Sequence, residues 1–338
     1  MRVMVALSFS PWPVRRGTDR LVINLLRGLS RYHRVKLLTM VLDPEGIGKL
    51  DELENDRISV EAIVAPHRRS FLSRVYYKIR NMVLSVLMRI PVQSLYAAPP
   101  AYLKLVAEEA VRWDADLTLV NYWHLEKLSR MINRGEKILL THDLDFMNCR
   151  GRIDSAGGFF GRLISKAGCS IRTRLELKAY GSFDRIMTVT EKEADDLKNF
   201  LKEPEKKIVP LPMAMDLEEF RADPRKWVRN SILLLGVFYS DFNRDSLIYF
   251  MEEILSRVIS RKPDARVDIV GPGIPDWVGK SLGRRGKVWG KVDDIKIHLE
   301  KSTVMALPLR FAAGVRIRML EAAAAGLPVV STPAGVRG

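Results

Sequence analysis

The sequence of residues 307–332 is LPLRFAAGVRIRMLEAAAAGLPVVST. This stretch decides which fold the sequence predicts. The apolar run from Thr303 to Leu309 predicts a buried strand. Gly314 gives the backbone room to turn into a helix, and Gly326 followed by Pro328 is the usual signal for a helix end. A second short apolar run follows. The stretch therefore predicts a strand, a glycine turn, a helix and another strand.

Three residues of the predicted helix lie near one face. Gly314 precedes Glu321 by two turns, and Arg318 precedes it by about one turn. A guanidinium and a carboxylate thus share a face close to a helix N-terminus. Because such an end carries free N–H groups and a positive dipole, it is a natural site for phosphate.

The runs Gly314–Ala322 and Gly326–Val330 resemble the donor-binding signature of the group 1 retaining glycosyltransferases (family 4). That family has the GT-B fold, an α/β arrangement of two doubly wound Rossmann-like domains that face each other across a cleft. The resemblance implies that the helix N-terminus binds the diphosphate of a nucleotide-sugar and that Glu321 binds the ribose hydroxyls. The alternative is an ordinary buried helix of an α/β domain, with Arg318 and Glu321 as a surface pair.

Composition narrows the class of protein. A chain of 338 residues with 47% hydrophobic residues suits two ordinary domains and excludes disordered and fibrous proteins. Two cysteines, Cys149 and Cys169, support neither a disulfide framework nor a metal site, so a reducing, cytoplasmic compartment fits. The apolar run at the N-terminus is too short for a signal peptide, and none reaches the roughly 20 residues that span a bilayer.

Positive charge is concentrated in one segment. The net charge is +15, yet no Asp or Glu occurs between Ala62 and Ala107, where cations alternate with bulky apolar residues. Residues 68–89 are predicted to form one or two helices that end before Pro91. Aromatic rings and long cations suit the headgroup zone of an anionic membrane, which we expect this segment to contact peripherally. A helix with one buried and one charged face is the alternative, and no recognised motif favours nucleic acid.

The chain opens with a βαβ pattern. Val3 to Leu7 predicts a strand, residues 18–32 a helix and Val35 to Val41 a second strand. The loop between the first strand and the helix lies where open α/β sheets bind ligands. In the resembled family this loop contacts the acceptor through a glycine pair, which is replaced here by Arg16 and Gly17. The alternative is a solvated basic loop.

Two later strands end in polar residues. Ala115 to Val120 is followed by residues 121–124, which include Trp123, and Lys137 to Leu140 is followed by residues 141–145, which include His142. Both ends are expected in one crevice. The resemblance implies that His142 acts near the reacting sugar. The alternative is a loop histidine bonded to Asp143 or Asp145.

The predicted domains are residues 1–212, on the acceptor side, and 213–338, which binds the nucleotide-sugar. By resemblance, relatives continue beyond the position of Gly338, so the second domain is expected to be incomplete at its C-terminus. A glutamate that contacts the donor sugar in many relatives is replaced here by Gly314. The resemblance places donor-binding residues at Gly236, Arg244, Gly290, Val292, Gly314, Val315, Arg316, Arg318 and Glu321, catalytic residues at His142, Arg318 and Glu321, and acceptor-binding residues at Arg16, Gly17, Trp123 and His142.

The expected activity is therefore transfer of a sugar from a nucleotide-diphosphate-sugar to a lipid-linked or cell-surface glycan acceptor, with retention of configuration. No cofactor and no metal are expected, because cations and a helix dipole can stabilise the leaving diphosphate. Two alternatives are a catalytically silent or truncated GT-B protein that acts as a scaffold, and a GT-B sugar-nucleotide epimerase.

Overall fold

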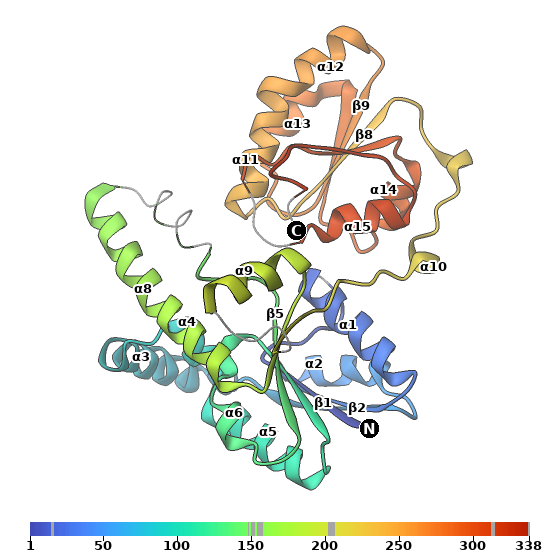
Figure 1. Cartoon of the computed structure of the whole chain (residues 1–338). Helices are drawn as coiled ribbons and strands as arrows, with labels where there is room; N and C mark the ends of the chain where they lie inside the picture. Colours follow the sequence, from blue (N-terminus) through green and yellow to red (C-terminus); the bar gives the residue numbers. More distant parts are fainter. Residues whose placement is uncertain are drawn as a thin grey trace. The chain divides into compact units, whose positions relative to one another are not determined.

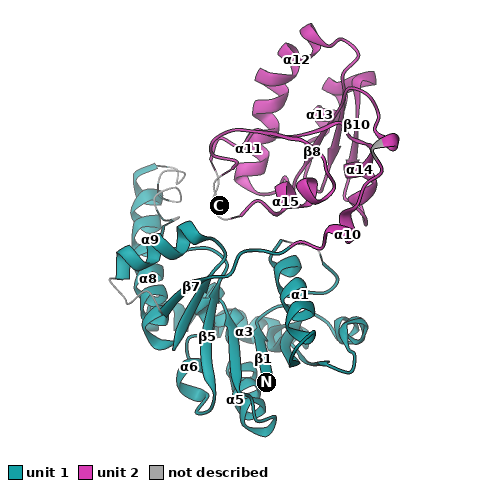
Figure 2. Cartoon of the chain, turned by 45° about the vertical axis from the view of Figure 1, so that its right-hand side comes forward, with its two compact units in different colours: residues 1–214 teal, residues 215–338 magenta. Residues whose placement is uncertain are grey.

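The computed structural model describes residues 1–14, 17–147, 149, 153, 158–201, 207–311 and 315–336. It divides into two compact units, unit 1 (Met1–Ala214) and unit 2 (Met215–Gly338), drawn in separate colours in Figure 2. The division falls two residues after the predicted boundary. Each unit contains one parallel sheet with helices packed against it, so the predicted α/β fold with two doubly wound sheets is confirmed.

Unit 1 has a seven-stranded parallel sheet in the order β3-β2-β1-β4-β5-β6-β7 (Figure 1). Its strands are β1 (Arg2–Leu7), β2 (Arg34–Val41), β3 (Ile58–Val64), β4 (Leu117–Asn121), β5 (Glu136–Thr141), β6 (Arg185–Thr188) and β7 (Ile208–Pro210). Its α-helices are α1 (Gly17–Ser30), α2 (Glu45–Gly48), α3 (Phe71–Met88), α4 (Val92–Ala97), α5 (Pro100–Arg112), α6 (Leu128–Met131), α8 (Gly158–Ser182) and α9 (Glu191–Leu201). Its described 3₁₀ turns include η1 (Lys49–Leu53), η2 (Pro66–Arg68) and η3 (Trp123–Leu125).

The central strand β1 explains why this sheet forms. Every residue from Val3 to Leu7 is buried, because helices cover both faces of a parallel sheet and a continuous apolar run is then required. Strand β3 and helix α5 were not predicted from the sequence. The chain runs outward from β1 to β3 and returns to β4 on the other side of β1. The sheet order therefore reverses between β1 and β4.

Unit 2 repeats this plan with five parallel strands in the order β10-β9-β8-β11-β12. The strands are β8 (Ser231–Leu235), β9 (Arg266–Val270), β10 (Gly286–Gly290), β11 (Val304–Leu307) and β12 (Val329–Ser331). The helices are α10 (Leu217–Phe220), α11 (Asp241–Tyr249), the π-helical segment η6 (Phe250–Ile254), α12 (Leu255–Arg261), α13 (Asp276–Leu282), α14 (Lys296–Lys301) and α15 (Ile317–Ala324), with 3₁₀ turns η5 (Pro224–Lys226) and η7 (Gly283–Arg285). Here the order reverses between β8 and β11.

The carboxyl ends of β8 and β9 meet through glycines. Gly271 has a φ of +131°, and a Cβ added to it would lie 1.7 Å from the carbonyl oxygen of Gly236. The Gly236 N–H donates to Val270, and the Gly271 N–H donates to Gly290 at 2.6 Å. Only a residue without a side chain permits this approach. The glycines thus set the close spacing of three strand ends.

Helix α15 ends as predicted but begins later. Gly326 has a φ of +69°, its N–H donates to Ala323, and the N–H of Leu327 donates to Ala322, which together form a Schellman cap. The start near Gly314 is wrong, because Val315 and Arg316 are not helical and Arg316, with φ −87° and ψ 85°, is the N-cap. The non-helical Arg316 places its guanidinium 5.5 Å from the ring centre of Phe242. Gly314 itself lies outside the described residues.

Candidate functional site

The reversal between β1 and β4 brings polar groups together in unit 1. Ligands of doubly wound sheets bind at the carboxyl ends of the strands at such a point. Asn121 is the last residue of β4, it is fully buried, and its Nδ2 donates to the carbonyl of Ala6 on β1 at 3.2 Å. Its Oδ1 lies 3.0 Å from Nε2 of His142, which follows β5. One amide therefore connects three neighbouring strands at this edge.

The hydrogen bonds of Asn121 fix the state of His142. Because Asn121 donates through Nδ2, its Oδ1 must accept, so Nε2 of His142 carries the proton and Nδ1 keeps a lone pair. His142 is 8% exposed, and its buried Nδ1 has no hydrogen-bond partner among the described residues. Burial lowers the pKa of His142 to about 4. The imidazole is thus neutral and can accept a hydrogen bond. The alternative prediction for His142 was a hydrogen bond to Asp143 or Asp145, but the observed partner is Asn121.

An aromatic ring stacks on this histidine. The ring of Tyr122 stacks on His142 with centroids 4.4 Å apart and lies 6.0 Å from the ring of Phe9. Tyr122 has a φ of +70° and a ψ of 142°, a conformation that costs about 1–3 kcal/mol in a residue with a side chain. Strain of this kind concentrates at functional sites. Sequence reasoning missed it, because a tyrosine gives no signal for a positive φ.

A second histidine was also missed. Nδ1 of His124 lies 2.9 Å from the hydroxyl of Ser94 on α4, and its ring lies 4.0 Å from that of Trp123. Burial is the main cause that lowers the pKa of His124 to about 4. Its position directly after the polar end of β4 is the sequence signal that could have identified it.

The loop after β5 is held by Glu176 of α8. The two carboxylate oxygens of Glu176 accept the N–H groups of Asp145 at 2.8 Å and Phe146 at 2.7 Å, and the Tyr180 hydroxyl donates to it at 2.6 Å. Burial is the main cause that raises the pKa of Glu176 to about 7. Glu176 is the single acidic residue of α8, among five basic ones, and that isolation is the signal that could have singled it out.

The residues that were predicted to bind the acceptor lie in different environments in unit 1. Trp123 is 6% exposed and packs in the core of unit 1, and its indole N–H donates to Asp145 at 3.4 Å. Its side chain therefore supports the edge of the sheet and exposes little surface to a ligand. Gly17 is the first residue of α1, after the carboxyl end of β1. Arg16 lies outside the described residues.

In unit 2 the reversal between β8 and β11 brings the signature helix to the end of β8. The Arg318 guanidinium donates from Nη1 to the carbonyl of Leu235, the last residue of β8, at 3.1 Å. Glu321, one turn further along α15, is 7% exposed. Burial lowers the pKa of Arg318, the charge of Glu321 opposes this shift, and the charge of Arg316 adds to it. Glu321 is therefore a buried residue and not part of a surface pair.

The other predicted donor residues lie in three places. Gly236 and Gly290 lie at the carboxyl ends of β8 and β10 and are joined through Gly271, and Val292 packs against the core beside these strands. Val315 and Arg316 directly precede α15, and burial lowers the pKa of Arg316. Arg244 is an exposed residue of α11. The sheet edge thus gathers Gly236, Gly290, Arg316, Arg318 and Glu321.

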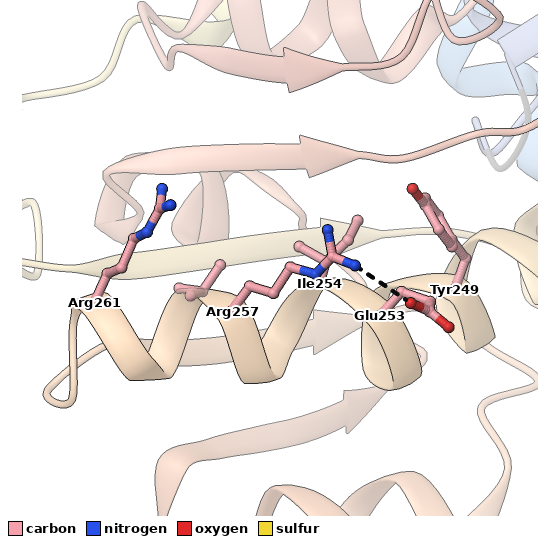
Figure 3. Close-up of a pocket in the computed structure, with 6 residues that line it drawn as sticks. Tyr249, Glu253, Ile254, Arg257 and Arg261 are labelled. Carbon is pink, nitrogen blue, oxygen red and sulfur yellow. Dashed lines mark ion pairs between the residues drawn. The ribbon is translucent and has the colours of Figure 1, made fainter.

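Unit 2 also has a surface hollow of about 220 Å³ on α11, the π-helical segment and α12 (Figure 3). It is lined by Tyr249, Glu253, Ile254, Arg257, Val258 and Arg261, and an ion pair of 3.7 Å joins Glu253 to Arg257. None of the predicted donor residues lines it. Within the described part of the chain, no group of three His, Cys, Asp or Glu side chains is placed to hold a metal ion.

Comparison with known proteins identifies one family model that matches part of the chain and several solved structures with a similar fold. A model of the family described as glycosyl transferases, group 1, matches residues 229–338. Among curated proteins, none matches the chain. Solved structures that resemble it include the sucrose-phosphate synthase of Thermosynechococcus elongatus, with a TM-score of 0.69 and 16% identity over 99% of this chain and 82% of that one.

Two further structures cover the chain to a similar extent. Anabaena HepE, solved in complex with UDP and glucose, has a TM-score of 0.58 and 13% identity, over 99% of this chain and 81% of that one. The lipopolysaccharide outer core galactosyltransferase WaaB has a TM-score of 0.56 and 11% identity, over 100% and 82%. At these identities the likeness shows the fold. The chain thus has the GT-B fold, and its second unit matches the group 1 glycosyl transferases.

Proposed function

We propose that the protein transfers a sugar from a nucleotide-diphosphate-sugar to an acceptor. The observation that carries this proposal is the Arg318 and Glu321 pair of α15, held at the sheet reversal of unit 2 inside the segment that matches the family model. A partly buried cation beside a helix N-terminus suits a diphosphate. A buried carboxylate one turn later suits the hydroxyls of a ribose.

The donor would be bound by few but strong contacts. Arg318 uses one N–H on Leu235, and a guanidinium has five, so further N–H groups can reach phosphate oxygens. Arg316 adds a second positive charge nearby. Two guanidinium groups with lowered hydration stabilise negative charge that develops on a leaving diphosphate, and this supports a reaction without a metal. HepE is similar in fold and has been solved with UDP-glucose, which supports a nucleotide-sugar donor.

On the acceptor side we propose that His142 accepts a hydrogen bond from a hydroxyl through Nδ1, together with groups near Gly17 and Arg16. The neutral imidazole, whose Nδ1 has no hydrogen-bond partner among the described residues, supports this role. We further propose that the acceptor is lipid-linked or a cell-surface glycan, that configuration is retained, and that the protein works in the cytoplasm at the inner face of a membrane contacted by residues 68–89. The galactosyltransferase WaaB, similar in fold, acts on the outer core of lipopolysaccharide, which supports such an acceptor class.

A panel of nucleotide-sugars tests the proposal, by binding and by transfer, with wild type and Glu321→Ala. Loss of contacts from a charged group to hydroxyls costs about 1.5–3 kcal/mol each, so we expect nucleotide-sugar affinity to fall at least tenfold. Glu253→Ala is the matched control, since Glu253 is an exposed carboxylate of unit 2 that forms an ion pair with Arg257.

Three results would contradict the proposal. If wild type binds no nucleotide-sugar, the donor assignment is wrong. Binding without turnover on any acceptor would favour a silent scaffold. An epimerised sugar nucleotide formed without an acceptor would favour an epimerase.

A further inference from the structure

Helix α3 exposes an unusual amount of apolar surface. Leu72 and Val86 are each 78% exposed, and no buried apolar residue anchors the helix, whose one buried residue is Asn81. The other exposed apolar residues of α3 are Phe71, Val75, Tyr76, Ile79, Met82, Val83, Leu87 and Met88. A hollow of about 320 Å³ lies among Tyr76, Ile79, Arg80, Val83 and Leu84. Apolar surface on this scale marks a binding surface.

The first turns of α8 have the same character. Phe159 is 77% exposed, Phe160 76% and Ile164 73%, with Leu163 beside them. Helix α8 is connected to α3 through α4, which follows α3 in the chain and packs against it. Gln93 of α4 accepts a hydrogen bond from Arg172 of α8 at 3.1 Å. Figure 1 shows the three helices grouped at one side of unit 1.

Both segments are basic. Neither α3 nor residues 158–166 of α8 contains Asp or Glu. Exposed cations stand beside the apolar residues, namely Arg68, Arg69, Arg74, Lys78, Arg89, Arg162 and Lys166. Within the described parts of the chain, no ion pair joins these cations to a carboxylate. The charge thus remains available to an anionic partner.

The apolar and basic character of these segments distinguishes between three possible binding partners. A second copy of the chain would present the same basic surface, so two such faces would repel each other. Nucleic acid offers phosphates but no apolar phase for Phe159, Phe160 and Leu72. An anionic bilayer satisfies both, because rings and aliphatic chains enter the headgroup and acyl boundary while arginine and lysine meet anionic lipids. None of the described helices is long and apolar enough to cross a membrane.

We infer that α3 and residues 158–166 of α8 both bind an anionic lipid bilayer. The inference deepens the proposed function, since it supplies the route by which unit 1 meets a lipid-linked acceptor. Each segment brings its own apolar residues and its own cations. The two helices together therefore bind a bilayer more tightly than α3 alone.

Co-sedimentation of the full chain with vesicles tests the inference, without any sugar nucleotide, so that a failure to bind lipid is separate from a failure to transfer sugar. Vesicles of phosphatidylserine mixed with phosphatidylcholine should bind the chain, added salt should weaken binding, and phosphatidylcholine alone should bind it poorly. We expect at least a tenfold weaker partition for Phe159→Gln/Phe160→Gln and for Leu72→Gln/Leu87→Gln. Val111→Gln on α5, 59% exposed, is the matched control and should bind like wild type.

The inference is overturned if wild type does not bind anionic vesicles, or if the α8 double variant binds as tightly as wild type. Sedimentation velocity without lipid provides a further check. A dimer that the same double variant dissociates would show that a second copy covers the surface instead.

Discussion

Replacing Glu176 by glutamine removes one acceptor from the support of the His142 loop. In wild type one carboxylate oxygen accepts the N–H of Asp145 and the Tyr180 hydroxyl, and the other accepts the N–H of Phe146. The amide nitrogen of glutamine has no lone pair to offer. Whichever way the amide is turned, one buried backbone N–H then loses its partner. That loss costs about 1–3 kcal/mol.

The effect of Glu176→Gln depends on pH, with a sign fixed by the pKa. The pKa of Glu176 is raised from 4.5 to about 7, so in this range the folded protein keeps a proton that the unfolded chain releases. This group therefore contributes stability that is fully present below about pH 4.5 and is lost as pH rises through 7. The full difference corresponds to about 3 kcal/mol. The glutamine variant has no proton to release, so its stability relative to wild type should rise as the pH increases from 5 to 8.

Urea unfolding at several pH values measures this effect, and initial rates of sugar transfer measure its consequence. Because the loop carries His142 and we propose that the donor binds unit 2, we expect kcat to fall while KM for the nucleotide-sugar stays nearly constant. Glu108→Gln is the control, since Glu108 is an exposed partner of Lys104 and such pairs contribute little. A deficit that does not change between pH 5 and 8, or an unchanged kcat, would refute the reasoning.

Three further predictions concern other residues of the two units. Gly271→Ala should destabilise unit 2 by about 3 kcal/mol or more, because the added Cβ meets the Gly236 carbonyl at a positive φ. Gly181→Ala, whose added Cβ has nothing within 4 Å, should stabilise α8 by about 0.5–1 kcal/mol. Urea unfolding compares the two variants, and equal effects on stability would contradict the close approach at Gly271. Burial lowers the pKa values of His124 and His142 to about 4, so their contribution to stability should be present above pH 6.5 and lost as pH falls towards 4. The melting temperatures of wild type and of His124→Asn/His142→Asn should therefore diverge across this pH range. Parallel curves of melting temperature against pH would exclude this linkage. Arg318→Met should weaken nucleoside-diphosphate binding more than tenfold by calorimetry, while Arg257→Met on α12 should not; equal losses would point to a general charge effect.

Local patterns in the sequence were sufficient for much of the fold. Continuous apolar runs such as Val3 to Leu7 predicted central strands, because both faces of a parallel sheet are covered. Gly326 predicted the end of α15 through its need for a positive φ. The start of α15 was placed too early, since the N-cap conformation of Arg316 depends on tertiary contacts.

The candidate site was predictable only in part. Polar residues after β4 and β5 were expected in one crevice, and the Asn121 to His142 hydrogen bond joins them. The contact of Glu176 with Asp145 spans 31 residues, and no local pattern encodes a pairing over that distance. The positive φ of Tyr122 was likewise hidden, because it is imposed by the packing around it.

Helix α8 mechanically connects its exposed first turn to the loop after β5. Phe160 lies in its first turn and Glu176 is 16 residues later, about 24 Å along a rod with a rise of 1.5 Å per residue. A helix of this length tilts as one piece. Any reorientation of its exposed end is therefore transmitted to the backbone amides of Asp145 and Phe146. The rate of hydrogen exchange at these two amides would therefore report whether the exposed first turn of α8 is in contact with a partner.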